Sequence, residues 1–149
     1  MSSDKARILV VDDEYAIRET TAALLEDEYE VVQCPNGEVA LRELRARAFD
    51  VVCTDFRMPG ITGAELIRAA KEEHPGIAGL IVTAYADYPS FQPMLHSVAC
   101  LVLLKPYEAE KLLEMVARSV RLARTKQLTS AALAEAARAS ASDRPAAKS

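Results

Sequence analysis

The segment VVCTDFRMPG, residues 51–60, joins a short apolar run to a carboxylate and a pair of turn-forming residues. An apolar run of this length, bounded by turn residues, is typical of a β-strand that is covered on both faces. Pro59 and Gly60 favour a sharp turn directly after it. We therefore predict a buried strand that delivers Asp55 to the start of a loop.

Three other apolar runs are also followed directly by polar residues. They are residues 8–11 before Asp12 and Asp13, residues 80–82 before Thr83, and residues 101–104 before Lys105 and Pro106. In an open parallel α/β sheet, ligands bind beyond the carboxyl ends of the strands. If the four runs are parallel strands of one sheet, three acids, a hydroxyl and an amine meet at one edge.

The segments between these runs have the spacing of helices. We expect a helix over about residues 14–28, a second that ends near residue 47, a third over about 63–73, and a last one from about 108. Residues 30–34 favour a weaker edge strand. A fourth helix is poorly specified, because Pro93 removes a hydrogen-bond donor, and we expect it to be short or to begin near Pro93. Strands that alternate with helices imply right-handed crossovers and a parallel α/β sheet.

The composition shifts towards Ala, Ser, Thr and Lys from about residue 124. We therefore predict a domain over residues 1–123 and a C-terminal tail or linker over residues 124–149, partly helical or disordered. Within it, residues 129–139 favour a marginal Ala-rich helix and residues 140–149 favour disorder. A long coiled coil is not expected, because the apolar heptad positions fade in this region.

Length and charge narrow the class of protein. The chain has 149 residues, of which 50% are hydrophobic, and a formal net charge of −4. This length favours one domain, and the negative charge argues against direct nucleic-acid binding. No apolar stretch approaches the roughly 20 residues of a membrane span, and the N-terminus lacks the apolar core of a signal peptide. Three cysteines without metal-ligand spacing, with Cys53 inside a strand, fit a reducing compartment, so we expect a cytoplasmic location.

The charge at the predicted sheet edge favours a metal site. Two carboxylates about 4 Å apart repel by roughly 4 kcal/mol at an effective dielectric constant near 20. A cation, a retained proton or Lys105 would offset the repulsion among Asp12, Asp13 and Asp55. Mg²⁺ is the simplest remedy, since it takes one or two carboxylates, several waters and phosphate oxygens. A metal, a lysine, the Thr83 hydroxyl and a free carboxylate together suit a phosphoryl group held covalently on an aspartate.

Each of these residues also has a simpler interpretation when it is taken alone. Asp12 and Asp13 fit the cap region of the first helix, and Asp55 fits a turn. Lys105 with its following proline fits an exposed turn, and Thr83 fits an ordinary strand end. Their joint placement at the ends of four buried runs favours the site.

The set resembles the signature of the receiver domain of two-component response regulators. The matching motifs lie within about residues 5–123 and are Asp12-Asp13, Asp55 with Met58-Pro59-Gly60, Thr83-Ala84, and Lys105-Pro106. The resemblance implies a flavodoxin-like α/β fold. Its five-stranded parallel sheet has strand order 2-1-3-4-5 and carries helices on both faces, in three doubly wound layers.

The resemblance also implies a metal site and a phosphoacceptor. Asp55 would take a phosphoryl group from a sensor histidine kinase or a phosphotransfer protein. Asp13, Asp55 and the backbone carbonyl of Arg57 would ligate Mg²⁺, and Asp12 would act mostly through a water. Thr83 and Lys105 would bind the phosphoryl oxygens, with a cis peptide bond after Lys105.

Some residues depart from the usual pattern of that family. Val102 stands where most receivers carry Tyr or Phe, and Pro93 falls in the fourth helix. We therefore expect the face of helix 4, strand 5 and helix 5, a possible homodimer surface, to respond to phosphorylation in an altered way. Arg57 and Tyr85 are expected to shield the acyl phosphate, or else to be two exposed side chains over the loop.

Three functions remain open at this point. The leading one is a signalling switch that changes its affinity for an unidentified output partner or for itself, with no catalysis beyond self-phosphorylation and autodephosphorylation. The second is a Mg²⁺-dependent phosphatase or phosphotransferase that uses Asp55 as a transient nucleophile. A haloacid-dehalogenase-type enzyme requires a second acid two residues later, where this chain has Arg57. The third is a binding module that is not phosphorylated.

Overall fold

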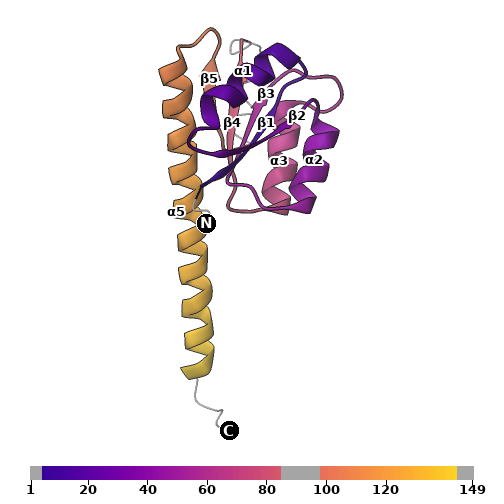
Figure 1. Cartoon of the computed structure of the whole chain (residues 1–149). Helices are drawn as coiled ribbons and strands as arrows, with labels where there is room; N and C mark the ends of the chain where they lie inside the picture. Colours follow the sequence, from indigo (N-terminus) through magenta and orange to yellow (C-terminus); the bar gives the residue numbers. More distant parts are fainter. Residues whose placement is uncertain (1–4, 85–97, 144–149) are drawn as a thin grey trace.

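The computed structural model describes residues 5–84 and 98–143. Their strands form one parallel sheet in the order β2-β1-β3-β4-β5, which confirms the predicted topology (Figure 1). The register pairs Val11 with Thr54 and Asp55 with Val82, so the C-terminal ends of the central strands lie level. The strands are β1 (Arg7–Val11), β2 (Glu30–Cys34), β3 (Val51–Asp55), β4 (Ala78–Thr83) and β5 (Leu101–Leu104).

Helices cover both faces of the sheet, which gives the predicted three layers (Figure 1). The described helices are α1 (Tyr15–Leu25), α2 (Gly37–Ala46), α3 (Gly63–Glu73) and α5 (Ala109–Asp143). On one face, α2 and α3 bury Leu44 and Leu66 in the core. On the other, α5 buries Leu112 and Val116 next to α1. The predicted fourth helix near Pro93 falls within residues 85–97, outside the described residues.

Local hydrogen bonds explain why two of the helices begin where they do. The Thr62 hydroxyl accepts from the backbone N–H of Glu65 at 3.1 Å, and the Glu65 carboxylate accepts from the Thr62 N–H at 2.8 Å. This capping box satisfies two donors at the start of α3, whose bounds are those predicted. At the start of α2, the Asn36 side chain accepts from the Val39 N–H at 2.9 Å.

Two glycines shape the loop that follows β3. Gly60 has a φ of 88°, a left-handed conformation that side chains other than glycine rarely adopt. A Cβ atom on Gly63 would lie only 2.2 Å from the carbonyl oxygen of Asp55, and the Gly63 N–H donates to the Phe56 carbonyl at 2.8 Å. The loop therefore folds tightly back over the end of β3 and fixes the backbone at Asp55.

Helix α5 is one continuous helix of 35 residues that runs through residue 124, where the predicted tail begins. No glycine or proline occurs between residues 109 and 144, and alanine-rich segments favour helix. The helix also extends into the segment predicted to be disordered, as far as Asp143. Among the helix residues whose burial the structure describes, Ala123 is the last buried one, and those from Leu128 onward are exposed. The last turns therefore project beyond the sheet (Figure 1).

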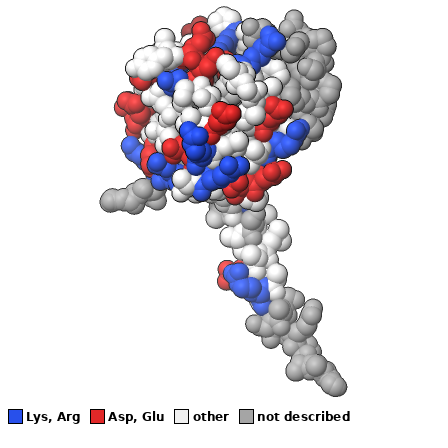
Figure 2. Space-filling view, turned by 90° about the vertical axis from the view of Figure 1, so that its right-hand side faces the viewer, with Lys and Arg blue, Asp and Glu red and all other residues white. Residues whose placement is uncertain are grey.

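The surface charge is mixed rather than segregated. Figure 2 shows acidic and basic side chains interspersed over the described part of the visible face. Among the described residues, no helix combines the length and apolar character that a membrane-crossing segment requires.

Candidate functional site

Three carboxylates meet at the C-terminal edge of the sheet. Asp12 and Asp13 follow β1 directly, and Asp55 is the last residue of the neighbouring strand β3. Each contributes one oxygen to a group in which all the oxygens lie within 4.8 Å of one another. The convergence predicted from the strand ends is therefore present.

Asp12 is buried, with only 6% of its surface exposed. One of its carboxylate oxygens accepts from the backbone N–H of Glu14 at 2.9 Å, and its backbone carbonyl accepts from Arg18 Nη1 at 2.8 Å. Its own N–H donates to the Cys34 carbonyl at 3.2 Å. Asp12 thus binds the backbone just before α1 and also faces the other two acids, whereas α1 itself has no side-chain cap.

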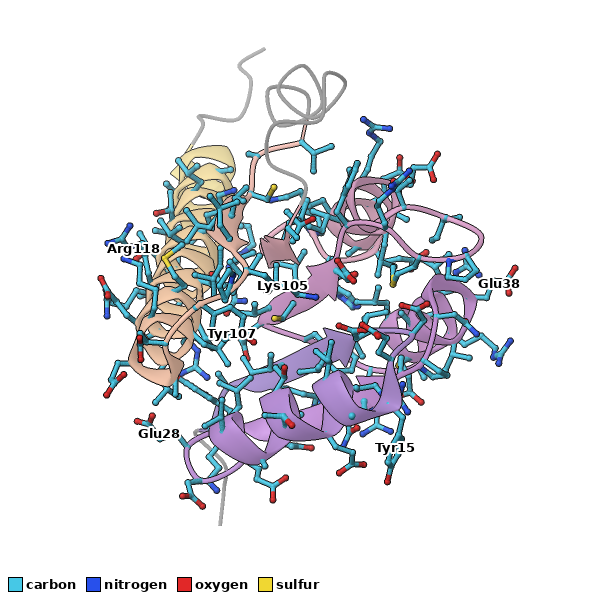
Figure 3. The ribbon with its side chains drawn as sticks, turned by 90° about the horizontal axis from the view of Figure 1, so that it is seen from above. Tyr15, Glu28, Glu38, Lys105, Tyr107 and Arg118 are labelled. Atoms are coloured by element: carbon cyan, nitrogen blue, oxygen red, sulfur yellow. The ribbon has the colours of Figure 1, made fainter. Side chains whose placement is uncertain are left out.

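Asp55 and Lys105 form the centre of the site. Asp55 Oδ1 accepts from the Phe56 N–H at 2.8 Å, which leaves Oδ2 facing Lys105 Nζ at 3.6 Å. The same ammonium lies 4.0 Å from Asp12 Oδ2. Figure 3 shows Lys105 reaching toward the centre of this edge of the sheet. The peptide bond between Lys105 and Pro106 is cis, as the resemblance implied.

Burial raises the pKa of both Asp12 and Asp55. For Asp12, desolvation is the largest cause, and the charges of Asp55 and Asp13 raise the pKa further. The hydrogen bond from the Glu14 N–H and the charge of Lys105 lower it. For Asp55, desolvation again leads, with Lys105 and the Phe56 N–H as the main opposing effects. One lysine therefore does not fully offset the cost of holding these charges together.

The donor set fits a hard divalent cation. Asp12, Asp13 and Asp55 present carboxylate oxygens from two directions within one small volume. Mg²⁺ takes one or two such oxygens and completes its shell with water or phosphate oxygens. Its charge would also remove the electrostatic penalty that burial imposes on Asp12 and Asp55.

The remaining predicted site residues lie around this centre. Thr83 is the buried last residue of β4, and its carbonyl accepts from the Lys105 N–H at 2.9 Å. The side chain of Arg57 is exposed in the loop after β3. The contacts predicted for the Thr83 hydroxyl and the Arg57 carbonyl stay predictions. Val102 packs against the core on the α2 and α3 face, whereas Tyr85 lies outside the described residues.

Sequence reasoning missed an apolar groove beside the site. It has a volume of about 650 Å³ and lies between α1 and the loop from β5 to α5. Ile17, Leu24 and Tyr107 supply apolar surface, and Lys105 and Pro106 form its border with the carboxylates. An aromatic residue directly after Lys105-Pro106 was the available signal, because it places a large side chain next to the site.

Comparison with known proteins places the chain in a family. Residues 8–117 match the family model of the response regulator receiver domain. The response regulator protein FleR of Pseudomonas aeruginosa is 35% identical over 76% of this chain. A CheY-like receiver domain protein from Methanospirillum hungatei JF-1 superposes with a TM-score of 0.77 at 26% identity, over 83% of this chain and 99% of that one. The BeF3-activated DrrB receiver domain gives 0.71 at 29% identity, over 78% and 98%.

The matched region is only part of the larger regulators. The chain spans 24% of the length of FleR, and 26% of that of the transcriptional regulatory protein ZraR of Klebsiella oxytoca. The two structural neighbours named above, in contrast, are covered almost completely. Both the family model and the topology identify the same unit, so the chain belongs to the response regulator receiver domains of two-component systems.

Proposed function

We propose that Asp55 accepts a phosphoryl group from a sensor histidine kinase or a phosphotransfer protein and that the acyl phosphate switches the association of this domain. The observation that carries the proposal is the environment of Asp55. Its Oδ2 lies 3.6 Å from Lys105 Nζ, and the Asp12 and Asp13 oxygens lie within 4.8 Å. A carboxylate with a cation on one side and two acids on the other suits a site that receives phosphate together with a metal.

The transfer step follows from this geometry. A carboxylate oxygen of Asp55 attacks phosphorus, and the bond between phosphorus and the imidazole nitrogen of the donor histidine breaks. The nitrogen keeps the electron pair and takes a proton from solvent, and Asp55 becomes an acyl phosphate. Lys105 lies on the side of Oδ2, where it stabilises the charge of the phosphoryl oxygens.

Asp12, Asp13, Asp55 and the Arg57 carbonyl would hold Mg²⁺. When bound, the ion screens the acids from the incoming phosphoryl group and draws charge from its oxygens. We assign to the Thr83 hydroxyl a hydrogen bond to one phosphoryl oxygen, since Thr83 ends the strand next to β3.

The groove between α1 and Tyr107 is the proposed docking surface for the phosphodonor. It borders the acceptor through Lys105, and its lining by Ile17 and Leu24 offers apolar area for a helix. A partner seated there reaches Asp55 without crossing α5. Three free cysteines fit a cytoplasmic meeting of the two proteins.

The output of the switch is expected to differ from that of receivers with an aromatic residue at position 102. Val102 contributes to the core cluster but has neither a ring nor a hydroxyl to reorient. A face formed by the fourth helix, β5 and α5 stays our proposal for self-association. Residues 85–97, where the fourth helix is expected, lie outside the described residues.

The competing functions have less support. A transient-nucleophile hydrolase of the haloacid-dehalogenase type requires an acid at position 57, and the exposed Arg57 stands there. A binding module without phosphorylation does not need three acids and a lysine gathered at one buried edge, where their desolvation is costly.

Intact-protein mass spectrometry separates the three functions. The full chain is incubated with acetyl phosphate and Mg²⁺, with Asp55→Asn as the matched control. A switch gains one phosphoryl group that the control lacks. Continuous release of inorganic phosphate at a rate typical of enzymes would favour the hydrolase instead, and the absence of any adduct would favour the binding module.

A further inference from the structure

A second cavity lies at the opposite end of the sheet from the carboxylates. It has a volume of about 370 Å³ and is formed where β4 and β5 begin, between α3 and α5. Such a volume is in the range of small-molecule sites. Its apolar walls come from the strand starts and from α5 and are Ala78, Ala99, Leu101 and Leu122.

Two lysines contribute to the lining of this cavity. Lys71 of α3 and Lys126 of α5 both line it, and the charge of Lys126 acts on Lys71. The Lys71 ammonium also donates to the Ile77 carbonyl at 3.3 Å. Burial, followed by the charge of Lys126, lowers the pKa of Lys71.

The paired ammonium groups have no acid to balance them in the part of the chain that the structure describes. The ion pairs there involve other lysines and arginines. The thiol of Cys100, which also lines the cavity, favours the charged form of Lys71. The two cations repel each other beside an apolar cavity, and a bound anion would offset this repulsion.

We propose that this cavity binds a small carboxylate with a short hydrocarbon body, held by Lys71 and Lys126 and covered by the walls of the cavity. The two lysines provide donors for both carboxylate oxygens, and Leu101 and Leu122 supply the apolar contact. A bare inorganic anion would leave the apolar walls uncovered, and a neutral alcohol would leave the two cations unbalanced.

Such a ligand would also connect α5 to the rest of the domain. Close by, Arg124 lies 3.5 Å from Asp50, and the Gln127 amide donates to the same carboxylate at 3.3 Å. Repulsion between Lys71 and Lys126 acts against this docking, because the two residues belong to different helices. A bound carboxylate removes the repulsion and bridges α3 to α5 where α5 leaves the domain.

The test is an NMR titration of the full ¹⁵N-labelled chain with hexanoate, 1-hexanol and inorganic phosphate. We expect hexanoate alone to give saturable shifts, centred on the amides of Ala78, Gly79, Ala99 and Leu101. Lys71→Gln and Lys126→Gln should each weaken binding about tenfold, the loss expected for a hydrogen bond to a charged group. Lys111→Gln, a change of an exposed lysine on α5 far from the cavity, should leave it unchanged.

Ala99→Leu provides an independent check, because it fills the cavity while keeping both lysines and changes only an exposed residue. It should abolish the hexanoate shifts and leave the remaining spectrum intact. Three outcomes would overturn the proposal: no saturable shifts with hexanoate, equal binding by 1-hexanol or phosphate, or binding that survives the Lys71→Gln, Lys126→Gln double substitution. None of these outcomes depends on phosphorylation of Asp55.

Discussion

At the scale of single residues, Lys105 is the side chain whose proposed role has the most direct geometric support. Its ammonium lies 3.6 Å from Asp55 Oδ2 and 4.0 Å from Asp12 Oδ2, and it comes from the strand end farthest from β1. This position supports our proposal that Lys105 binds the phosphoryl oxygens at Asp55.

Lys105→Gln should slow formation of the Asp55 acyl phosphate by about a hundredfold, the usual effect of removing one group that stabilises charge in a transition state. The measurement is the rate of adduct formation with acetyl phosphate and Mg²⁺. Lys111→Gln is the matched control, since Lys111 is exposed and pairs only with Glu114 in the described residues. An unchanged rate in Lys105→Gln would remove Lys105 from the mechanism.

The raised pKa values of Asp12 and Asp55 predict how stability depends on pH without metal. In the unfolded chain both carboxyls titrate near 3.8, whereas the folded chain keeps their protons to higher pH. Folded protein therefore binds more protons within this window, and stability falls as pH rises from 3.8 through the raised values. Asp12→Asn keeps an acceptor for the Glu14 N–H but removes one titrating charge.

In EDTA, the stability that Asp12→Asn gains over the unsubstituted chain should grow as pH rises from 3.8 and then level off. Urea unfolding at a series of pH values measures it, and Asp27→Asn, a change of an exposed acid, should show no such gain. Excess Mg²⁺ should reverse the order by stabilising the unsubstituted chain more. A constant difference between the two proteins across the pH series would contradict the electrostatic account.

At the scale of elements, the loop after β3 connects the fold to the chemistry. A Cβ atom at Gly63 would meet the Asp55 carbonyl at 2.2 Å, so Gly63→Ala forces the backbone of the acceptor to move. We expect a loss of about 2 kcal/mol or more in unfolding free energy, typical of overpacking, together with slower phosphorylation. Gly60→Ala should lower the unfolding free energy by about 1 kcal/mol. The positive φ strains an alanine there, but its Cβ atom would lie in open space.

Urea unfolding and adduct formation are the two measurements for this pair of variants. If Gly63→Ala were no more destabilising than Gly60→Ala, the close approach of α3 to Asp55 would not be a constraint on the site.

The same elements show what the sequence could and could not predict. Apolar runs that end in Asp55, Thr83 and Lys105 located the strands and the site edge, because strand periodicity and turn residues are local signals. The bounds of α3 were predictable because Thr62 and Glu65 form a capping box. The end of α1 at Leu25 was not, since its last residues carry no glycine or proline stop.

Contacts between distant residues were beyond local patterns. The attachment of α5 through Asp50, Arg124 and Gln127 joins residues up to 77 positions apart. The pairing of Lys71 with Lys126 has the same character. Neither has a signal in residue type or spacing, because each depends on where two helices end relative to the sheet.

At the scale of the whole molecule, the predicted domain end at residue 123 falls inside α5. Arg124 and Gln127 still contact Asp50, whereas the described side chains from Leu128 onward are exposed. We therefore expect a chain that ends at Gln127 to have a free energy of unfolding within about 0.5 kcal/mol of that of the full chain, as for other changes at exposed positions.

A chain that ends at residue 123 should lose about 1 kcal/mol or more, because it lacks the hydrogen bond and ion pair to Asp50. Urea unfolding of the three lengths, monitored by circular dichroism, makes the comparison. Equal stability of the two shortened chains would show that the contacts with Asp50 do not anchor α5.

The central claim is that acids from two strands gather around a metal and leave Asp55 to accept the phosphoryl group. Peptide-level mass spectrometry after treatment with acetyl phosphate, with Mg²⁺ or with EDTA, tests it most directly. We predict that one phosphoryl group forms on Asp55 with Mg²⁺ and that none forms in EDTA. A phosphoryl group on Asp12 or Asp13, or equal labelling of Asp55 in EDTA, would contradict the claim.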